Sequence, residues 1–334
     1  MPDKEIKSQN KSKTSKASPT QPLRVVFMGT PDFAVPSLVA LLQKDTLYEI
    51  VGVFTQPPRP ANRGQKPQKS PVHLCAEDHN LTLFTPEKLS PVDAYESFCA
   101  LAPDVCVVVA YGALLPQRYL DVPTHGCINV HGSLLPRWRG ASPIHASVIY
   151  GDTEGGITIM EMVRELDAGD MLAHVAVPIT PKTTAGEFHD VLCHKGAEIL
   201  THTLARYCAG NIIPVPQDHT LATYSGKLTK ESGRIDWTQS ASFVDRHIRG
   251  HTPWPGAWFT YDGVRIKVLK ATPVITLEMK PGEISPDSMH IGCRGGAMRL
   301  ETVQRAGKEP QDIIPFLRGF PMAPGSCVIH SRAL

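Results

Sequence analysis

Two hydrogen-bonding side chains stand at the end of an apolar run in the segment CINVHGSLLPRWRG, residues 127 to 140. Asn129 and His131 occupy alternate positions, and side chains alternate faces along a strand, so both would point the same way. A carboxamide and an imidazole side by side can donate hydrogen bonds to one developing negative oxygen. The pair predicts an oxyanion-binding site, while a satisfied polar pair at a strand end remains the alternative on residue types alone.

A third group would be needed to orient His131 or to move protons. The segment RELDAGD, residues 164 to 170, places Asp167 before Ala-Gly at a turn that follows the apolar run ITIMEMV. A lone aspartate in a loop is usually a solvated turn residue, so this spacing by itself leaves the role of Asp167 open. The sequence contains no serine elbow and no reactive-cysteine motif. An attacking group would therefore have to come from the substrate.

The elements that would position these side chains alternate between strand and helix from Leu23 onward. Apolar runs rich in β-branched residues, typical of a parallel sheet covered on both faces, predict strands at 23–29, 48–55, 81–84, 104–111, 126–132 and 171–179. Helices are expected at 33–43, 70–80, 90–102 and 183–210. This order predicts an α/β fold with a Rossmann-like doubly wound sheet. Asn129 and His131 would face the crevice beyond the carboxyl ends of the strands, where such sheets bind ligands.

Signals for nucleotide and metal cofactors are missing from the sequence. The first turn, GTPDF, is not the dinucleotide-binding fingerprint, and the chain has no phosphate-loop lysine motif. The eight cysteines form no C-x-x-C pair, and the histidines form no metal-binding group, so we expect no disulfide and no metal. No apolar run approaches the roughly 18 residues of a membrane span. With no export or transit signal, we expect a cytoplasmic protein without a membrane partner.

The length of 334 residues favours two domains. We expect a disordered lysine-rich tail at 1–22, a catalytic domain at 23–209, a linker at 210–225 and a C-terminal domain at 226–330. Short alternating strands with glycine turns predict that the C-terminal domain is a small β-barrel of the OB-like kind. Residues 23–225 carry fourteen Lys and Arg against twenty Asp and Glu, but residues from 226 onward carry fifteen against ten. This basic half favours a polyanionic partner.

The segments INVHGSLLPRWRGASPI and GITIMEMVRELDAGDML resemble the formyltransferase family that uses 10-formyltetrahydrofolate. The segments RVVFMGTPDFAVPSL and VVVAYGALLP match the same family, and the resemblance covers residues 23 to about 320. It implies that Asn129, His131 and Asp167 are the catalytic residues. It also implies a folate site and a folate cosubstrate, with no metal. The residues expected to line that site are Ser133, Leu134, Leu135, Pro136, Tyr111 and Gly112.

The resemblance also implies a mechanism. A substrate amine attacks the formyl carbon carried on N10 of the folate, and Asn129 and protonated His131 hold the oxyanion of the tetrahedral intermediate. Asp167 orients or charges His131 and helps to move the amine proton toward the leaving nitrogen. Glu165 departs from the family pattern, in which glycine often stands there, and adds a charge near Asp167.

The loop TQPPRPANRGQKPQKSPV, residues 55 to 72, points to the acceptor of the formyl group. It holds four basic residues, five prolines and no acid, and loops this long are usually functional or disordered. It resembles the insertion by which the tRNA-acting members of the family engage the acceptor end, with Arg63 at the contact arginine and Arg59 and Lys66 beside it. Pro58 stands where the family commonly has an acid, which removes a negative charge beside nucleic acid.

Residues 224–259 resemble the start of the tRNA-binding C-terminal domain of the same members. Lys227, Lys230 and Arg234 are candidate phosphate contacts, while three tryptophans at 237, 254 and 258 are expected in the core or at a domain interface. The resemblance therefore implies initiator methionyl-tRNA as the partner, and we expect a monomer. Two alternatives remain: a formyltransferase for a nucleotide-linked amino sugar, and a non-catalytic RNA-binding protein on the same fold.

Overall fold

The computed structural model describes residues 21–61 and 66–328, so the lysine-rich tail and Arg63 lie outside the described residues. A seven-stranded sheet has the order β10-β9-β7-β6-β1-β2-β5, in which β7, β6, β1, β2 and β5 are parallel and β9 is antiparallel to both of its neighbours, β7 and β10. The strands are β1 (Leu23–Gly29), β2 (Tyr48–Phe54), β5 (Leu83–Phe84), β6 (Val105–Val109), β7 (Cys127–His131), β9 (Glu154–Glu161) and β10 (Met171–Pro178). The predicted doubly wound α/β fold is confirmed.

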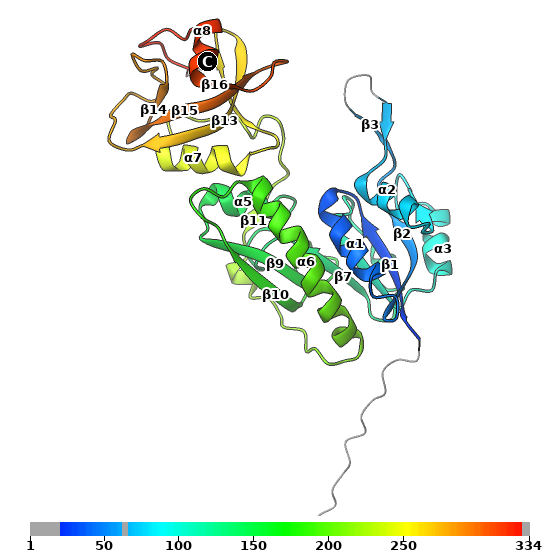
Figure 1. Ribbon diagram of the computed structural model, residues 1–334. Coiled ribbons are helices and arrows are strands. Elements are labelled where there is room, and N and C mark those ends of the chain that lie inside the picture. The colour runs from blue at the N-terminus through cyan, green and yellow to red at the C-terminus, as the bar shows by residue number, and fades with distance from the viewer. Residues whose placement is uncertain (1–20, 62–65, 329–334) are drawn as a thin grey trace, which may run out of the picture.

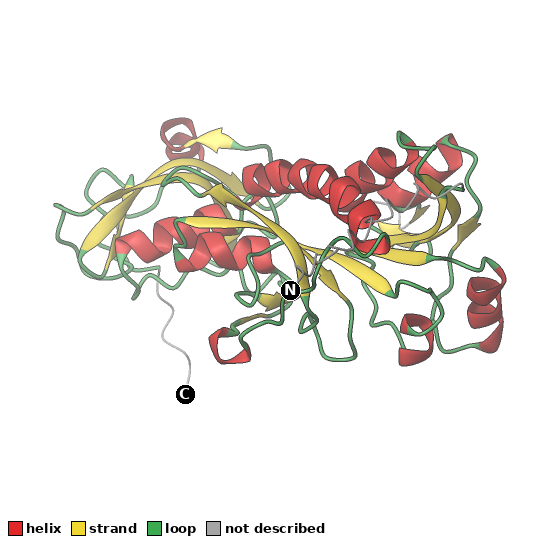
Figure 2. Ribbon diagram, turned by 90° about the horizontal axis from the view of Figure 1, so that it is seen from below, coloured by secondary structure: helices red, strands yellow, loops and turns green. Residues whose placement is uncertain are grey.

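Helices cover both faces of this sheet because its central strands are apolar on both faces. Along β1, Val25 and Phe27 pack into one buried cluster, and Val26 and Met28 pack into another on the opposite face. The first cluster lies under α1 (Val35–Leu42), α2 (Pro71–Asp78) and α6 (Ala185–Cys208), and the second lies under α3 (Val92–Ala100) and α4 (Gln117–Leu120). Figure 2 shows the long helix α6 lying across the sheet.

Side chains at the helix starts explain where two of these helices begin. The Ser70 hydroxyl accepts a hydrogen bond from the amide of His73 at 3.0 Å, and Pro71 occupies the first turn of α2. Helix α6 begins with a capping box between Thr184 and Glu187. None of the helices in the described part of the chain is long and apolar enough to cross a membrane.

The basic loop at 55–72 carries a two-stranded antiparallel hairpin, formed by β3 (Arg59–Ala61) and β4 (Lys66–Gln68). It connects β2 to α2 and projects from the domain in Figure 1. Composition did not predict this hairpin, in which Pro60 pairs with Pro67, because proline cannot donate to a strand ladder and is confined to edge strands.

The second domain has its own core, built on five antiparallel strands. They are β12 (Ala257–Tyr261), β13 (Val264–Val274), β14 (His290–Cys293), β15 (Gly296–Arg305) and β16 (Gln311–Asp312). Helices α7 (Ala241–Gly250) and α8 (Ile313–Gly319) complete it. Trp237 and Trp258 are buried as expected, but Trp254 is 55% exposed and is not a core residue.

The two domains meet where α7 packs on α5 (Pro143–Tyr150) of the first domain. A side chain at Gly250 would collide with Ile149, so the two helices approach closely there. Arg246 donates to the Ile149 carbonyl at 3.3 Å, and Arg249 donates to the Thr183 carbonyl at 2.8 Å. Figures 1 and 2 show the domains side by side in an elongated molecule.

Residues 210–225 run back along the first domain before they enter the second. Val215 exchanges two backbone hydrogen bonds of 2.9 Å with Met171, and β11 (Tyr224–Ser225) pairs with β8 (Arg139–Gly140). A short 3₁₀ turn at His219–Leu221 lies between these contacts. The segment is thus attached to the loop that follows β7.

Candidate active site

Strand β7 carries Asn129 and His131 in the middle of the sheet, between β6 and β9. Ile128 and Val130 point into the cluster under α1 and α6, so Asn129 and His131 point to the opposite face. His131 is buried, whereas Asn129 is partly exposed. Within the described parts of the chain, the Asn129 carboxamide takes part in no hydrogen bond, which leaves it free to donate to a bound molecule.

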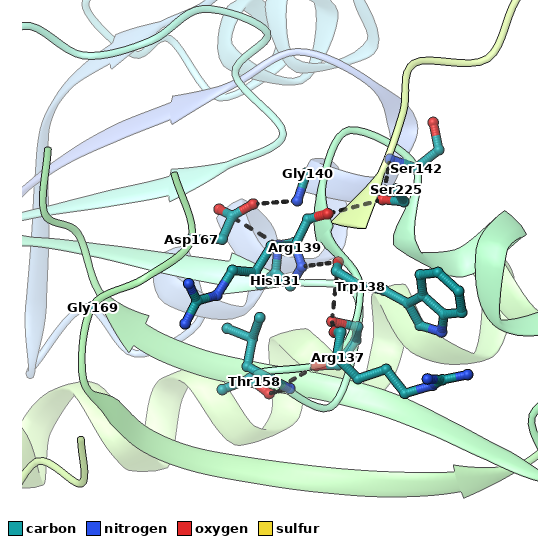
Figure 3. A network of polar contacts seen from close by, with 12 residues as sticks. His131, Arg137, Trp138, Arg139, Gly140, Ser142, Thr158, Asp167, Gly169 and Ser225 are labelled. Carbon is teal, nitrogen blue, oxygen red and sulfur yellow. Dashed lines mark hydrogen bonds and ion pairs between the residues drawn. The ribbon is translucent and has the colours of Figure 1, made fainter. Parts of the chain in front are cut away.

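The two ring nitrogens of His131 have different partners (Figure 3). Nε2 lies 3.0 Å from the carbonyl oxygen of Trp138. Because a carbonyl can only accept, Nε2 carries a proton, and the neutral ring has its lone pair on Nδ1. Nδ1 lies 3.8 Å from Oδ1 of Asp167, an ion-pair distance rather than a hydrogen bond. Nδ1 is therefore the atom that can gain a proton beside the carboxylate.

Asp167 adopts a left-handed backbone conformation, with φ of 50°, which aspartate tolerates better than most residues. Its Oδ2 accepts a hydrogen bond of 2.7 Å from the amide of Gly140, while Oδ1 faces His131. Only 12% of the Asp167 side chain is exposed, so its attraction to an imidazolium is weakly screened. Glu165 is exposed, and its charge is solvated rather than buried beside the carboxylate.

The loop after β7 is braced from within. The Thr158 hydroxyl donates to the Ser133 carbonyl at 2.7 Å and accepts from the Leu135 amide at 3.1 Å. The Ser133 hydroxyl donates to the Arg137 carbonyl at 2.6 Å and is buried. The Ser133 hydroxyl is thus engaged inside the loop, and a folate contact would have to use other atoms of residues 133–136. Of these, Leu135 is buried, and Leu134 and Pro136 are partly buried.

An open groove of about 470 Å³ lies on the outer side of the same loop, lined by Leu134, Arg137 and Trp138 and by residues from α5 to β9. Asp152 fixes the side chains of Trp138 and Arg137, since its carboxylate accepts from the Trp138 indole at 2.6 Å and from Arg137 Nε at 2.9 Å. Figure 3 shows Trp138 and Arg137 pointing away from Asp167. The loop itself therefore separates the groove from His131 and Asp167.

Tyr111 and Gly112 follow β6, the neighbour of β7. The Tyr111 ring is buried in the cluster under α3 and α4, and burial raises the pKa of its phenol to about 12. Its carbonyl accepts from the Thr30 hydroxyl at 2.8 Å, and that hydroxyl accepts from the Gln56 amide at 3.3 Å. These contacts tie together the segments that leave β6, β1 and β2. Gly112 has φ of 88°, a conformation that favours glycine.

The candidate tRNA contacts fall on both domains. Arg59 on β3 is exposed and donates to the Gln56 side chain at 3.0 Å, and Lys66 begins β4. Lys227, Lys230 and Arg234 are exposed at the start of the second domain. The structure does not bring the two groups into contact within the described residues, so a polyanion that touched both would have to bridge the domains.

Sequence reasoning missed two buried residues, Arg139 and Gln217, which are 3% and 4% exposed. Gln217 accepts from Arg139 at 2.7 and 3.1 Å and donates to the carbonyls of Asp167 and Gly169 at 2.9 and 2.7 Å. Arg139 had a local signal in the basic PRWRG motif. Gln217 had none, because a polar residue in a proline-bearing segment is typical of a linker.

The arrangement can stabilise an oxyanion but supplies no nucleophile of its own. An amide donor and a histidine whose Nδ1 faces a carboxylate suit attack by a substrate amine on a carbonyl carbon. Across the described residues, no group of three or more His, Cys, Asp or Glu side chains could hold a metal ion. The fold and the site thus define a group-transfer enzyme that works on a carbonyl compound.

Comparison with known proteins gives the family. Residues 23–204 match the formyl transferase family model, and residues 227–321 match the model for the formyl transferase C-terminal domain. The chain belongs to the formyl transferase family. It is 47% identical over 304 residues to a methionyl-tRNA formyltransferase of Ruegeria pomeroyi, covering 91% of this chain and 99% of that protein. It is 44% identical over 310 residues to the methionyl-tRNA formyltransferase of Gluconobacter oxydans, covering 92% and 100%.

Solved structures show the same fold at low identity. HypX from Aquifex aeolicus in complex with tetrahydrofolic acid gives a TM-score of 0.60 at 19% identity, covering 88% of this chain and 47% of that one. The sugar 3N-formyl transferase WlaRD also gives 0.60, at 14% identity, covering 86% and 99%. These likenesses concern the fold alone.

Proposed function

We propose that this chain transfers the formyl group of 10-formyltetrahydrofolate to the amino group of methionyl-initiator tRNA, giving N-formylmethionyl-tRNA for translation initiation. The observation that carries the proposal is the similarity to methionyl-tRNA formyltransferases along almost the whole of both chains, second domain included. The sugar-nucleotide alternative has only a likeness of fold behind it, and the free Asn129 carboxamide beside His131 and Asp167 disfavours a non-catalytic binding protein.

The geometry supports a specific division of roles at the site. Asn129 donates one hydrogen bond to the oxyanion that forms when the methionyl amine attacks the formyl carbon. Protonated His131 donates a second from Nδ1, because Nε2 is held by the Trp138 carbonyl. Asp167 stabilises the imidazolium across 3.8 Å and accepts the amine proton, directly or through water. The C–N10 bond then breaks, and the leaving nitrogen takes up a proton.

Folate would lie across the carboxyl ends of β6 and β7. Residues 133–136 and the segment that begins at Tyr111 and Gly112 leave these neighbouring strands, so both face the crevice. The proposal also places the enzyme in the cytoplasm. It further holds that the enzyme is a monomer, and light scattering at assay concentrations would test this oligomeric state.

The tRNA would contact the hairpin at 59–68 and the basic start of the second domain. These contacts would be with phosphates, which position the RNA and make binding depend on salt. The match of residues 227–321 to the model for the formyl transferase C-terminal domain supports the second contact.

Neutralising the hairpin tests the choice of acceptor. In the variant Arg59→Ala/Arg63→Ala/Lys66→Ala, we expect kcat/KM for methionyl-tRNA to fall at least about tenfold. The slope of log kcat/KM against log salt concentration should also become shallower by roughly one for each phosphate contact that is lost. The KM for the folate should not change. Lys69→Ala is the matched control, because Lys69 is already paired with Glu77 at 2.7 Å. Unchanged kcat/KM and salt dependence in the triple variant would remove the hairpin from tRNA binding.

A further inference from the structure

The segment between the two domains, residues 210–225, contacts the loop that follows His131 and the strand that follows the Asp167 turn. On the loop after β7, the amide of Arg139 donates to the Thr223 carbonyl at 2.8 Å, and the amide of Trp138 donates to the Thr223 hydroxyl at 2.9 Å. Ala141 donates to the Ser225 carbonyl at 3.1 Å. On the other side, Val215 pairs with Met171, just past the Asp167 turn. The segment therefore connects the loop after β7 with the start of β10, next to the Asp167 turn.

The Gln217 side chain hydrogen-bonds to both of these regions. Its amide nitrogen donates to the Asp167 carbonyl at 2.9 Å and to the Gly169 carbonyl at 2.7 Å. Its amide oxygen accepts from Nη2 and Nε of Arg139 at 2.7 and 3.1 Å. Both protons and both lone pairs of the carboxamide are thus used, and the residue is buried. One side chain spans from the Asp167 turn to the loop whose Trp138 carbonyl holds His131.

Arg139 explains why the carboxamide is held firmly. Its guanidinium is buried and, among the described residues, takes part in no ion pair, so its acceptors are the Gln217 oxygen and His219 Nδ1, the latter at 3.2 Å. A buried cation needs such acceptors, because desolvation without them is costly. Gln217 is therefore fixed on one side by a buried charge and can fix the backbone of Asp167 on the other.

We propose that Gln217 is a positioning residue for the catalytic reaction, which holds the Asp167 carboxylate at its ion-pair distance from Nδ1 of His131. The attraction between a carboxylate and an imidazolium depends on their separation, and Asp167 itself has a left-handed backbone conformation, with φ of 50°. The two amide bonds of Gln217 restrain that turn at Asp167 and at Gly169. This inference rests on the proposed formyl transfer.

The substitution Gln217→Glu tests the two sets of hydrogen bonds of this side chain separately. A glutamate keeps the shape and still accepts from Arg139, now as an ion pair, but at neutral pH it has no proton to donate to the Asp167 and Gly169 carbonyls. Gln217→Met keeps the volume without either set of bonds. Thr220→Ala is the matched control on the same segment, because Thr220 is exposed and, within residues 21–61 and 66–328, its hydroxyl bonds only to the Asp218 side chain.

The experiment measures kcat, both KM values, the pH dependence of kcat and the thermal midpoint of the full-length variants, with wild-type turnover as the reference. We expect Gln217→Glu and Gln217→Met to lower kcat about 10- to 100-fold, with both KM values within about threefold. Their pH–kcat profiles should move to lower pH, because a displaced carboxylate supports the protonated imidazole less. In an Asp167→Asn background, Gln217→Glu should lower kcat little further, since both changes act on the same interaction between Asp167 and His131.

Three results would overturn the inference. They are wild-type kcat with only a lowered thermal midpoint, a loss confined to KM, or fully additive losses in the Asp167→Asn background. If Gln217→Glu does not fold, Gln217→Met decides by the same criteria, and failure of both to fold while Thr220→Ala is normal would show a structural role instead. An inactive wild-type protein would overturn the proposed function itself, which is a distinguishable outcome.

Discussion

At the scale of single residues, the site depends on which atoms are engaged by the protein and which are free. Nε2 of His131 is hydrogen-bonded to the Trp138 carbonyl, and Oδ2 of Asp167 accepts from the Gly140 amide. The Asn129 carboxamide has no partner within the described residues. Within the described residues, the groups that make no hydrogen bond are therefore the Asn129 carboxamide, Nδ1 of His131 and Oδ1 of Asp167, and the last two face each other as an ion pair. The types of these residues could be read from the sequence, but the assignment of atoms could not, because it depends on contacts that only the folded loop makes.

Removing the free carboxamide should slow the reaction. For Asn129→Ala we expect a loss of about 100- to 1,000-fold in the rate of single-turnover formyl transfer, as is typical when one oxyanion donor is lost. Substrate KM values should change little, because the bond forms mainly in the transition state. Asn211→Ala, at an exposed position outside the site, is the control. Near-normal single-turnover transfer by Asn129→Ala would take this residue out of the mechanism.

Removing only the charge of Asp167 should separate its electrostatic role from its structural one. Asp167→Asn can still accept from the Gly140 amide through its oxygen, so we expect a thermal midpoint close to that of the wild type. Turnover should fall by at least about 100-fold, because neither the imidazolium nor the amine proton has its carboxylate. A rate within a few-fold of the wild type would show that the 3.8 Å pair does not contribute to the reaction.

At the scale of elements, the strands and helices of the first domain followed from local patterns, whereas the connections between them did not. Apolar β-branched runs predicted β1, β2, β6 and β7, and Ser-Pro predicted the start of α2. The hairpin of β3 and β4 and the return of residues 210–225 were missed. The bonds between Arg139 and Gln217 join residues 78 positions apart, and a local pattern carries no information about such pairs.

The pairing of β8 with β11 gives a prediction at this scale. Gly140 has φ of 105°, and a side chain there would collide with the carbonyl oxygen of Ser225. Gly140→Ala should therefore separate the two strands, lower stability by at least about 1 kcal/mol and reduce turnover. Gly126→Ala is the control, because Gly126 has φ of 67° but no atom within 4 Å of the added carbon. Urea unfolding of both variants checks this, and equal losses would mean that backbone strain alone, not the close approach, determines the cost.

At the scale of the whole molecule, three histidines gather around the end of α7, where the domains meet. The rings of His247 and His251 are 4.1 Å apart, and their Nε2 atoms are buried without a partner in the described residues. Burial, followed by the nearby His251, lowers the pKa of His145 on α5 and of His247 to about 4, and burial also lowers the pKa of His251. These side chains are therefore neutral in the folded protein at neutral pH.

Stability should fall with pH as a result. The unfolded chain binds a proton at each histidine near the ordinary pKa of about 6.5, while folded His247 does so only near 4. Between these values the unfolded state holds more protons, so stability is lost as the pH falls from about 6.5 toward 4. We expect a loss on the order of 1 kcal/mol from His247 by pH 5.5. Urea unfolding at pH 7.5 and 5.5 measures it. In His247→Phe this pH dependence should weaken, and an unchanged slope would contradict the assignment.

The most direct measurement of the function mixes the protein with formyl-labelled 10-formyltetrahydrofolate and three acceptors: methionyl-initiator tRNA, uncharged initiator tRNA and an amino-sugar nucleotide. We expect label on methionyl-tRNA alone, and a rate reduced at least about 100-fold in Asn129→Ala. Label on the sugar nucleotide would keep the chemistry at Asn129 and His131 but contradict the tRNA acceptor. No transfer to any acceptor by the folded wild-type protein would contradict formyl transfer itself.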